Sequence, residues 1–288
     1  MAHREIDQHS GVETTGHDWD GLKELNNPLP KWWLYLFYAC IVWAIGYWVL
    51  YPAWPGISGY TGGLLGHSNR LEALSDVASA TANRNAGAKD IETLPFDKIE
   101  ANPALLQFAL ANGKAAFANN CAPCHGAGAL GSPGYPNLQA GDWLWGGKVD
   151  DIYQTIRVGV RSTSPDTRGV PMPAFGKDGI LKKDEINDVA DFVMTLSDPA
   201  YKAAGVAHGK QIFADNCASC HGEAGTGNQE MGAKNLTTKV HLYAWSKETV
   251  VAQITNPKLG VMPTWEGKLD PITLKSLAIY VHDLGGGQ

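Results

Sequence analysis

The chain has 288 residues, of which 44% are hydrophobic and 18% are charged, and its formal net charge is −6. This length suits about two domains, and the composition is that of a globular protein rather than a disordered one. Because no basic tract offsets the acidic balance, the chain is not expected to bind nucleic acid.

The first long apolar stretch runs from Trp32 to Tyr51 without one charged residue. It has the length that a helix needs to cross a bilayer core, and tryptophan and tyrosine at both ends are typical of membrane interfaces. A buried core helix is the alternative. A cleaved signal peptide fits poorly, because a mostly polar segment precedes the run and no small-residue cleavage site follows it. We predict an N-terminal segment over residues 1–31 and one transmembrane helix over residues 32–54, in which Cys40 packs as an inert side chain.

The segment after this helix, residues 55–100, is rich in Gly, Ser, Ala and Asn. This composition predicts a linker between the membrane and the rest of the chain. Residues 70–82 could form a helix, or the whole segment could be a flexible tether.

Two copies of Cys-x-x-Cys-His follow, and they carry the chemistry of the chain. The residues are Cys121, Cys124 and His125 in the first copy and Cys217, Cys220 and His221 in the second. In a c-type haem site the two sulfurs form thioethers with the haem and the histidine binds its iron. Zinc is the alternative, but paired Cys-x-x-Cys zinc ligands are usually separated by roughly 15–20 residues, far fewer than here. No strand–helix pattern supports a thioredoxin-like site either, so we predict two covalently bound haems c.

Haem attachment also indicates the orientation of the chain in the membrane. In bacteria a c-type haem is ligated outside the cytoplasmic membrane, whereas the charges that flank the apolar helix favour neither direction. We therefore expect a single-span protein of the bacterial inner membrane with a cytoplasmic N-terminus and periplasmic haem domains.

An internal repeat surrounds the two motifs. The segment Gly113–Cys121 matches Gly209–Cys217, and the amphipathic pattern of residues 181–196 is repeated over residues 269–284. Each repeat thus contains a helix, a haem motif, a loop rich in Gly and Pro, and a closing helix. We predict a mainly α fold with cytochrome c domains over residues 101–198 and 199–288.

Each repeat resembles a class I cytochrome c domain, in which the first and last helices cross. The resemblance implies that small and aromatic residues meet at each crossing. These residues are Gly113, Phe117 and Phe192 in the first domain and Gly209, Phe213 and Tyr280 in the second.

The same resemblance implies a methionine as the second axial ligand of each iron. Met172, in Val-Pro-Met-Pro, is expected to bind the iron of haem 1, and Met262, in Val-Met-Pro, that of haem 2. The neighbouring prolines favour stiff, extended loops. Met194 is interpreted as a core residue, and Met231 is the alternative ligand for haem 2. Three histidines, His208, His241 and His282, are further alternatives. Two six-coordinate irons would leave no position for substrate, which predicts one-electron transfer without a catalytic residue in this chain.

Several segments narrow the family further. They resemble the dihaem (CcoP or FixP) subunits of cbb3-type cytochrome c oxidases. The resemblance rests on residues 14–33, 51–55, 121–125, 142–147, 227–232, 260–263 and 280–287, and thus covers nearly the whole chain apart from the linker.

This resemblance implies a subunit of a respiratory enzyme. It would accept electrons from a soluble or membrane-bound cytochrome c and relay them to a monohaem cytochrome c subunit. A haem–copper subunit would then reduce oxygen to water and pump protons. No histidine cluster for copper occurs in this sequence, so the oxygen chemistry is expected in that partner. A dihaem peroxidase and a stand-alone membrane-tethered shuttle are the alternatives. Trp143, Trp145 and Arg157 could contact haem propionates, or they could be surface and core positions.

Overall fold

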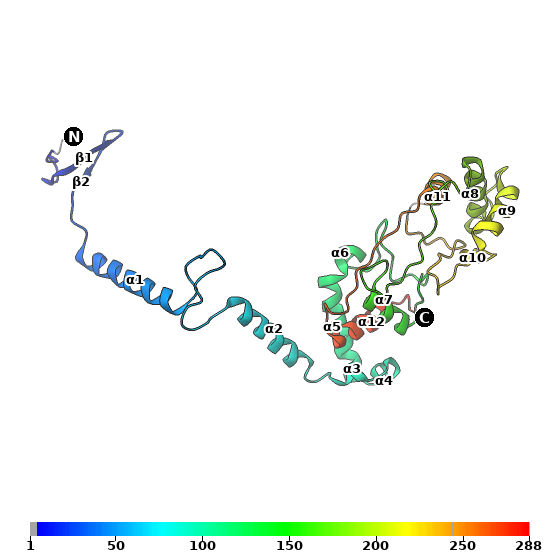
Figure 1. Ribbon diagram of the computed structural model, residues 1–288, viewed down its shortest axis with the longest axis horizontal. Coiled ribbons are helices and arrows are strands. Elements are labelled where there is room, and N and C mark those ends of the chain that lie inside the picture. The colour runs from blue at the N-terminus through cyan, green and yellow to red at the C-terminus, as the bar shows by residue number, and fades with distance from the viewer. Residues whose placement is uncertain (1–4, 244, 288) are drawn as a thin grey trace. The chain divides into compact units, whose positions relative to one another are not determined.

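The computed structural model describes residues 5–243 and 245–287. Positions 1–4 of the predicted N-terminal segment, and positions 244 and 288 of the predicted second domain, lie outside the described residues. The chain divides into two units, Met1–Asn83 and Arg84–Gln288. Figure 1 shows both units, and each is described by itself below.

The first unit begins with a β-hairpin that the sequence analysis did not predict. Strand β1 (Thr14–Trp19) pairs antiparallel with β2 (Leu22–Leu25). The two residues between them, Asp20 and Gly21, have φ angles of 54° and 89°. Positive φ at both positions is what a two-residue hairpin turn of type I′ requires, and Asp-Gly is a strong signal for it.

Helix α1 (Lys31–Leu50) follows, with exposed side chains along most of its length and none buried. Among the described residues it is the helix that is long and apolar enough to cross a bilayer. It ends before the predicted boundary at residue 54, because Tyr51 precedes Pro52 and is held in an extended conformation. Helix α2 (Asn69–Asn85) includes residues 70–82, so the helical alternative for that stretch is confirmed.

The second unit contains two hydrophobic cores. The first core is built from α3 (Asp90–Thr93), α4 (Phe96–Glu100), α5 (Pro103–Asn120), α6 (Ala122–His125), α7 (Val149–Val158) and α12 (Pro271–Asp283). Ile91, Phe96 and Ile99 are buried in it. The last part of the predicted linker therefore belongs to this core and is not a tether.

The second core is built from α8 (Lys183–Ser197), α9 (Val206–Asn216), α10 (Ala218–His221) and α11 (Lys247–Thr255). In Figure 1 these helices gather at one end of the unit, apart from α5 and α12. Each core thus contains one haem-motif turn, α6 or α10, at the end of a long helix.

The closing helices are exchanged relative to the sequence prediction. Helix α12 packs on α5, where the rings of Phe117 and Tyr280 lie 5.6 Å apart between centroids. Helix α8 packs on α9, where the rings of Phe192 and Phe213 lie 5.2 Å apart. The expected pairing of Phe117 with Phe192 and of Phe213 with Tyr280 is therefore wrong, although small and aromatic residues do meet at each crossing.

Glycines allow the close approach of the helices at both crossings. A Cβ atom on Gly113 would overlap the carbonyl oxygen of Ser276 in α12, and one on Gly209 would overlap the carbonyl oxygen of Asp188 in α8. Any larger residue would push the helices apart. The glycine at the same position of each repeat is thus explained by backbone contact with the exchanged helix.

The exchange takes place where two extended segments cross. Val160, just after α7, and Met262, between α11 and α12, form an antiparallel bridge. The N–H of Val160 donates to the carbonyl oxygen of Met262 at 3.0 Å, and the reverse bond measures 2.9 Å. From this bridge the chain continues to α8 in the second core in one case and to α12 in the first core in the other.

Candidate functional site

The first haem motif folds as a single helical turn at the end of α5. The N–H groups of Cys124 and His125 donate to the carbonyl oxygen of Cys121 at 3.1 and 2.9 Å. Gly126, with a φ angle of 80°, ends the turn. A turn of this kind brings both sulfurs and the imidazole to one side of the chain.

The second motif repeats this geometry at the end of α9. Cys220 and His221 donate to the carbonyl oxygen of Cys217 at 3.2 and 2.9 Å, and Gly222 follows with a φ angle of 76°. The four motif cysteines form no disulfide bond. Burial, together with the neighbouring cysteine, raises the pKa of Cys121 and Cys217 to about 11.

Both motif histidines are held by a backbone carbonyl. His125 Nδ1 lies 3.2 Å from the carbonyl oxygen of Pro136, and His221 Nδ1 lies 2.9 Å from that of Lys234. A hydrogen bond at Nδ1 leaves Nε2 available for a metal. Burial lowers the pKa of both imidazoles, and the hydrogen bond to the backbone only partly opposes it. Both histidines are therefore kept neutral, as iron ligation requires.

The methionines lie opposite to their predicted assignment. Met262 packs against the first core, together with Cys121. Met172 packs against the second core, together with Cys217. The structure thus brings Met172 to the second motif and not to His125, because its segment leads into α8 after the crossing at Val160.

A cavity of about 430 Å³ lies beside the second motif. Its walls are mostly apolar, and they include Met172, Cys217, Cys220, His221 and Met231. An apolar hollow of this volume whose walls contain cysteine, histidine and methionine side chains has the chemistry of a haem pocket.

The alternative ligands lie in different surroundings. Met194 packs in the second core, as predicted. Met231 and His241 both line the cavity, where the His241 ring stacks on Trp245 with 3.8 Å between centroids. His208 and His282 lie outside it. His208 Nδ1 lies 2.8 Å from the carboxylate of Asp188, and His282 Nδ1 lies 3.8 Å from that of Glu100.

Two arginines support the fit of a haem. Arg157 Nε and Arg168 Nε are buried and have no hydrogen-bond partner in the described part of the chain. The propionates of a haem are carboxylates, which are the groups that a guanidinium binds best. Arg157 was one of the residues expected from the sequence to contact a propionate, whereas Arg168, in a loop outside both motifs, was not predicted.

The two tryptophans of the 142–145 segment make protein contacts. The Trp143 indole donates to the carbonyl oxygen of Gly286. Trp145 accepts at its carbonyl from Arg168 at 3.0 Å, and the guanidinium lies 5.6 Å from the centre of its ring.

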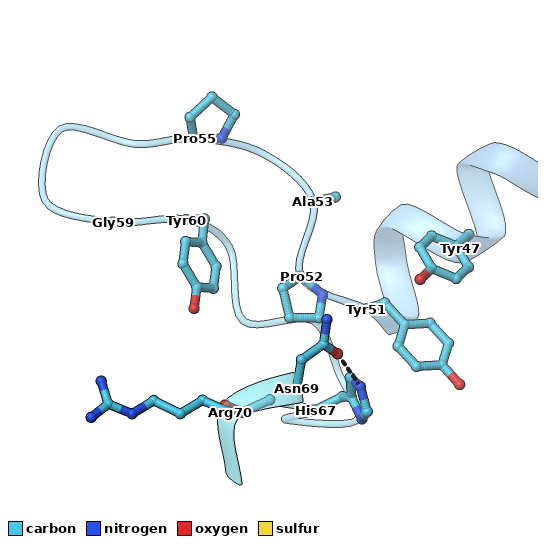
Figure 2. Close-up of a pocket in the computed structure, with 11 residues that line it drawn as sticks. Tyr47, Tyr51, Pro52, Ala53, Pro55, Gly59, Tyr60, His67, Asn69 and Arg70 are labelled. Atoms are coloured by element: carbon cyan, nitrogen blue, oxygen red, sulfur yellow. Dashed lines mark hydrogen bonds between the residues drawn. The ribbon is translucent and has the colours of Figure 1, made fainter. Parts of the chain in front are cut away.

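The first unit has a hollow of its own at the end of α1, shown in Figure 2, with a volume of about 620 Å³. Tyr47 and Tyr51 line it, and His67 Nε2 donates a hydrogen bond to Asn69 Oδ1 at 2.7 Å. In Figure 2 the Arg70 side chain extends away from these groups. No residue of either haem motif lines this hollow, so it is not a haem site.

Three family models match successive parts of the chain. Residues 11–58 match the N-terminal domain of cytochrome oxidase-cbb3, FixP. Residues 110–197 match cytochrome c, and residues 204–281 match cytochrome C oxidase, cbb3-type, subunit III.

Full-length relatives agree with these matches. The chain is 51% identical to the cbb3-type cytochrome c oxidase subunit FixP of Bradyrhizobium diazoefficiens over 287 residues, which cover 99% of each chain. It is 52% identical to FixP of Azorhizobium caulinodans over 99% of this chain and 97% of the relative. It is 50% identical to the subunit CcoP of Azospirillum brasilense over the whole length of both.

Proposed function

The chain belongs to the FixP and CcoP family of cbb3-type cytochrome c oxidase subunits, and from this premise we propose how it works in electron transfer. It is a membrane-anchored subunit of a cytochrome c oxidase, with cytochrome c domains that carry covalently bound haem. A haem c bound in such a domain supplies one-electron chemistry. The relatives are named oxidase subunits, which gives no support to the peroxidase or the free-shuttle alternative.

The observation that carries the proposal is the pair of Cys-x-x-Cys-His turns. In each turn a backbone carbonyl holds Nδ1 of the histidine. We assign Cys121 and Cys124 to haem 1 and Cys217 and Cys220 to haem 2, which gives two haems in the chain. The histidine of each turn is then the first axial ligand, with its tautomer set before the haem binds.

The second axial ligands are assigned across the exchange. Met262 would serve haem 1 and Met172 would serve haem 2, since each packs with the cysteine of that motif. Met231 also lines the second cavity, but it lies on the loop that carries Lys234, which already holds His221. Met172 comes from a different segment, so it is the better candidate for the opposite side of the ring. Methionine ligation keeps the reduction potential high.

The orientation and the partners complete the proposal. Residues 5–30 would lie in the cytoplasm and the unit after Asn83 in the periplasm, where haem is attached. Electrons would enter from a soluble or membrane-bound cytochrome c. They would leave toward a monohaem subunit and a haem–copper subunit, which reduces oxygen and pumps protons.

Oxygen uptake by the purified assembly tests this function. An assembly captured through a tag on this chain, supplied with reduced cytochrome c, should consume oxygen in a cyanide-sensitive reaction, and haem b should co-purify. A preparation that contains haem c alone and consumes no oxygen would contradict the oxidase role. Peroxide turnover in that preparation would instead support the peroxidase.

A marked haem tests the methionine assignment. In a Cys217→Ala variant, haem 2 keeps one vinyl group, so its visible absorption band moves to longer wavelength and can be told from that of haem 1. Met262→Ala should then abolish methionine ligation at the unmarked haem and Met172→Ala at the marked one. The opposite result would restore the assignment expected from sequence, and an effect of Met231→Ala alone would identify Met231 as the ligand of haem 2.

A further inference from the structure

A four-residue segment of the first half of the second unit lies against the second haem site. This segment, residues 142–145, precedes α7 of the first core. Leu144 is part of the wall of the cavity beside His221. Gln229, from the loop after the second motif, donates to the carbonyl oxygen of Trp143 at 3.2 Å. The ring of Trp145 lies so close to Gly232 of the same loop that a Cβ atom there would overlap it.

The strongest contact of this segment is an ion pair between Asp142 and Lys234. Both side chains are largely buried, with 13% of Asp142 and 23% of Lys234 exposed. Thr238 donates to the Asp142 carboxylate at 2.8 Å and accepts from the Lys234 amine at 3.1 Å. A buried pair with an added hydrogen bond holds its partners in one geometry, and removal of either charge leaves the other uncompensated.

Lys234 also touches the second haem site directly. Its carbonyl oxygen is the acceptor for His221 Nδ1 at 2.9 Å, and the residue lines the cavity. The corresponding position of the first repeat is Pro136, whose carbonyl holds His125. Because proline suffices to hold a histidine there, the lysine side chain is not needed for that hydrogen bond. Its charge has another role, and Asp142 is the group that it meets.

We propose that Asp142 is a positioning residue for the second haem site: from the half that carries the first motif, it fixes Lys234 and thereby the orientation and the electrostatic surroundings of His221. The inference rests on the proposed function only in that the second motif holds a haem. It links the second haem site to the half of the unit that carries the first motif, since Asp142 belongs to that half and contacts Lys234. A buried cation beside a haem favours the reduced iron, and Asp142 offsets that cation.

Redox titration of the full chain tests this proposal, with haem 2 marked by Cys217→Ala in every sample. Asp142→Asn should raise the potential of haem 2 and leave that of haem 1 unchanged. The expected change is about tenfold in the equilibrium between the two haems, or about 59 mV for a one-electron couple. Lys234→Met should lower the potential of haem 2, and the double variant should return close to the parent value. Asp142→Glu keeps the negative charge, so it should leave the potential of haem 2 close to the parent value. Asp150 is an exposed acid on α7, and Asp150→Asn is the matched control.

Two results would overturn the proposal. One is that neither Asp142→Asn nor Lys234→Met moves the potential of haem 2, and the other is that both haems shift equally. If Asp142→Asn does not fold, the two Lys234 variants decide the question. Lys234→Met should lower the potential of haem 2, and Lys234→Arg, which keeps the positive charge, should not. A failure of the proposed function is distinguishable, because it would show as missing haem or absent oxygen uptake in the unsubstituted chain.

Discussion

The exchange of the closing helices can be tested by a double-mutant cycle at the aromatic crossing of the first core. Phe117 is 2% exposed, and its ring meets that of Tyr280 in α12. Replacement of Phe117 by Ala should cost about 3–5 kcal/mol of unfolding free energy, from lost burial and the cavity left behind. A contacting aromatic pair adds about 0.5–1.5 kcal/mol of its own. The Phe117→Ala/Tyr280→Ala cycle should therefore show a coupling of about 1 kcal/mol.

The same cycle with Phe192 is the control. Phe192 lies in α8 against Phe213, so Phe117→Ala and Phe192→Ala should be additive within about 0.3–0.5 kcal/mol. Denaturant unfolding of the purified chain, followed by circular dichroism, gives all the free energies. The proposed thioether bonds would keep the haem groups on the unfolded chain. Coupling in the Phe117/Phe192 cycle, with none in the Phe117/Tyr280 cycle, would refute the exchange.

Three further predictions concern other parts of the chain. Gly209→Ala should destabilise the second core, because its Cβ would overlap the carbonyl of Asp188, whereas Gly87→Ala has open space and should not; melting temperatures compare the two. Asp270 is buried in part, which opposes its charge, but hydrogen bonds from Thr273 outweigh this and hold its pKa below the ordinary value. Its capping of α12 thus stabilises the fold above pH about 3.9 and is lost as the pH falls through the lower folded pKa. Asp270→Ala should cost about 1 kcal/mol at neutral pH and remove this step from the acid-unfolding curve; an unaltered curve would contradict it. Deletion of α1 behind an added export signal should move the chain from alkali-washed membranes to the soluble periplasmic fraction, and retention in the membranes would mean that another segment anchors it.

The local features of the chain could be predicted because short sequence patterns determine them. The Cys-x-x-Cys-His spacing predicts a helical turn, and both motifs have that form. The apolar run after Lys31 predicts α1, and the spacing of apolar residues predicts α8 and α12. The hairpin of β1 and β2 could also have been predicted, because Asp20-Gly21 is a turn signal.

The partner of each closing helix could not be predicted in the same way. Helices α8 and α12 carry the same apolar pattern, and each presents its backbone to a glycine of α5 or α9. A repeat of this kind makes either helix compatible with either core, so local patterns cannot choose between them. The proposed assignment of Met172 and Met262 depends on that choice, which is why the sequence predicted the opposite pairing of these two methionines with the motifs.

Chain connectivity provides a physical reason for the choice. In the second core the exchange joins α8, which ends at Ser197, to α9, which begins at Val206, as consecutive helices. Without it, α9 would have to pair with α12, which begins at Pro271. The exchange therefore halves the length of the segment that closes this core more than twice. Each halving lowers the free-energy cost of loop closure by about 0.6 kcal/mol.

In the first core the exchange lengthens the connecting segment. Helix α5 ends at Asn120 and pairs with α12, which begins at Pro271, and not with α8, which begins at Lys183. That loop little more than doubles, so its cost is about 0.6–0.9 kcal/mol, less than the gain in the second core. The exchanged fold is thus favoured by closure entropy and not merely tolerated. Because α12 follows all the helices of the second core in sequence, the first core can close only after the whole second core has been synthesised. Haem 1, nearest the membrane anchor in sequence, obtains its proposed methionine from the far end of the chain.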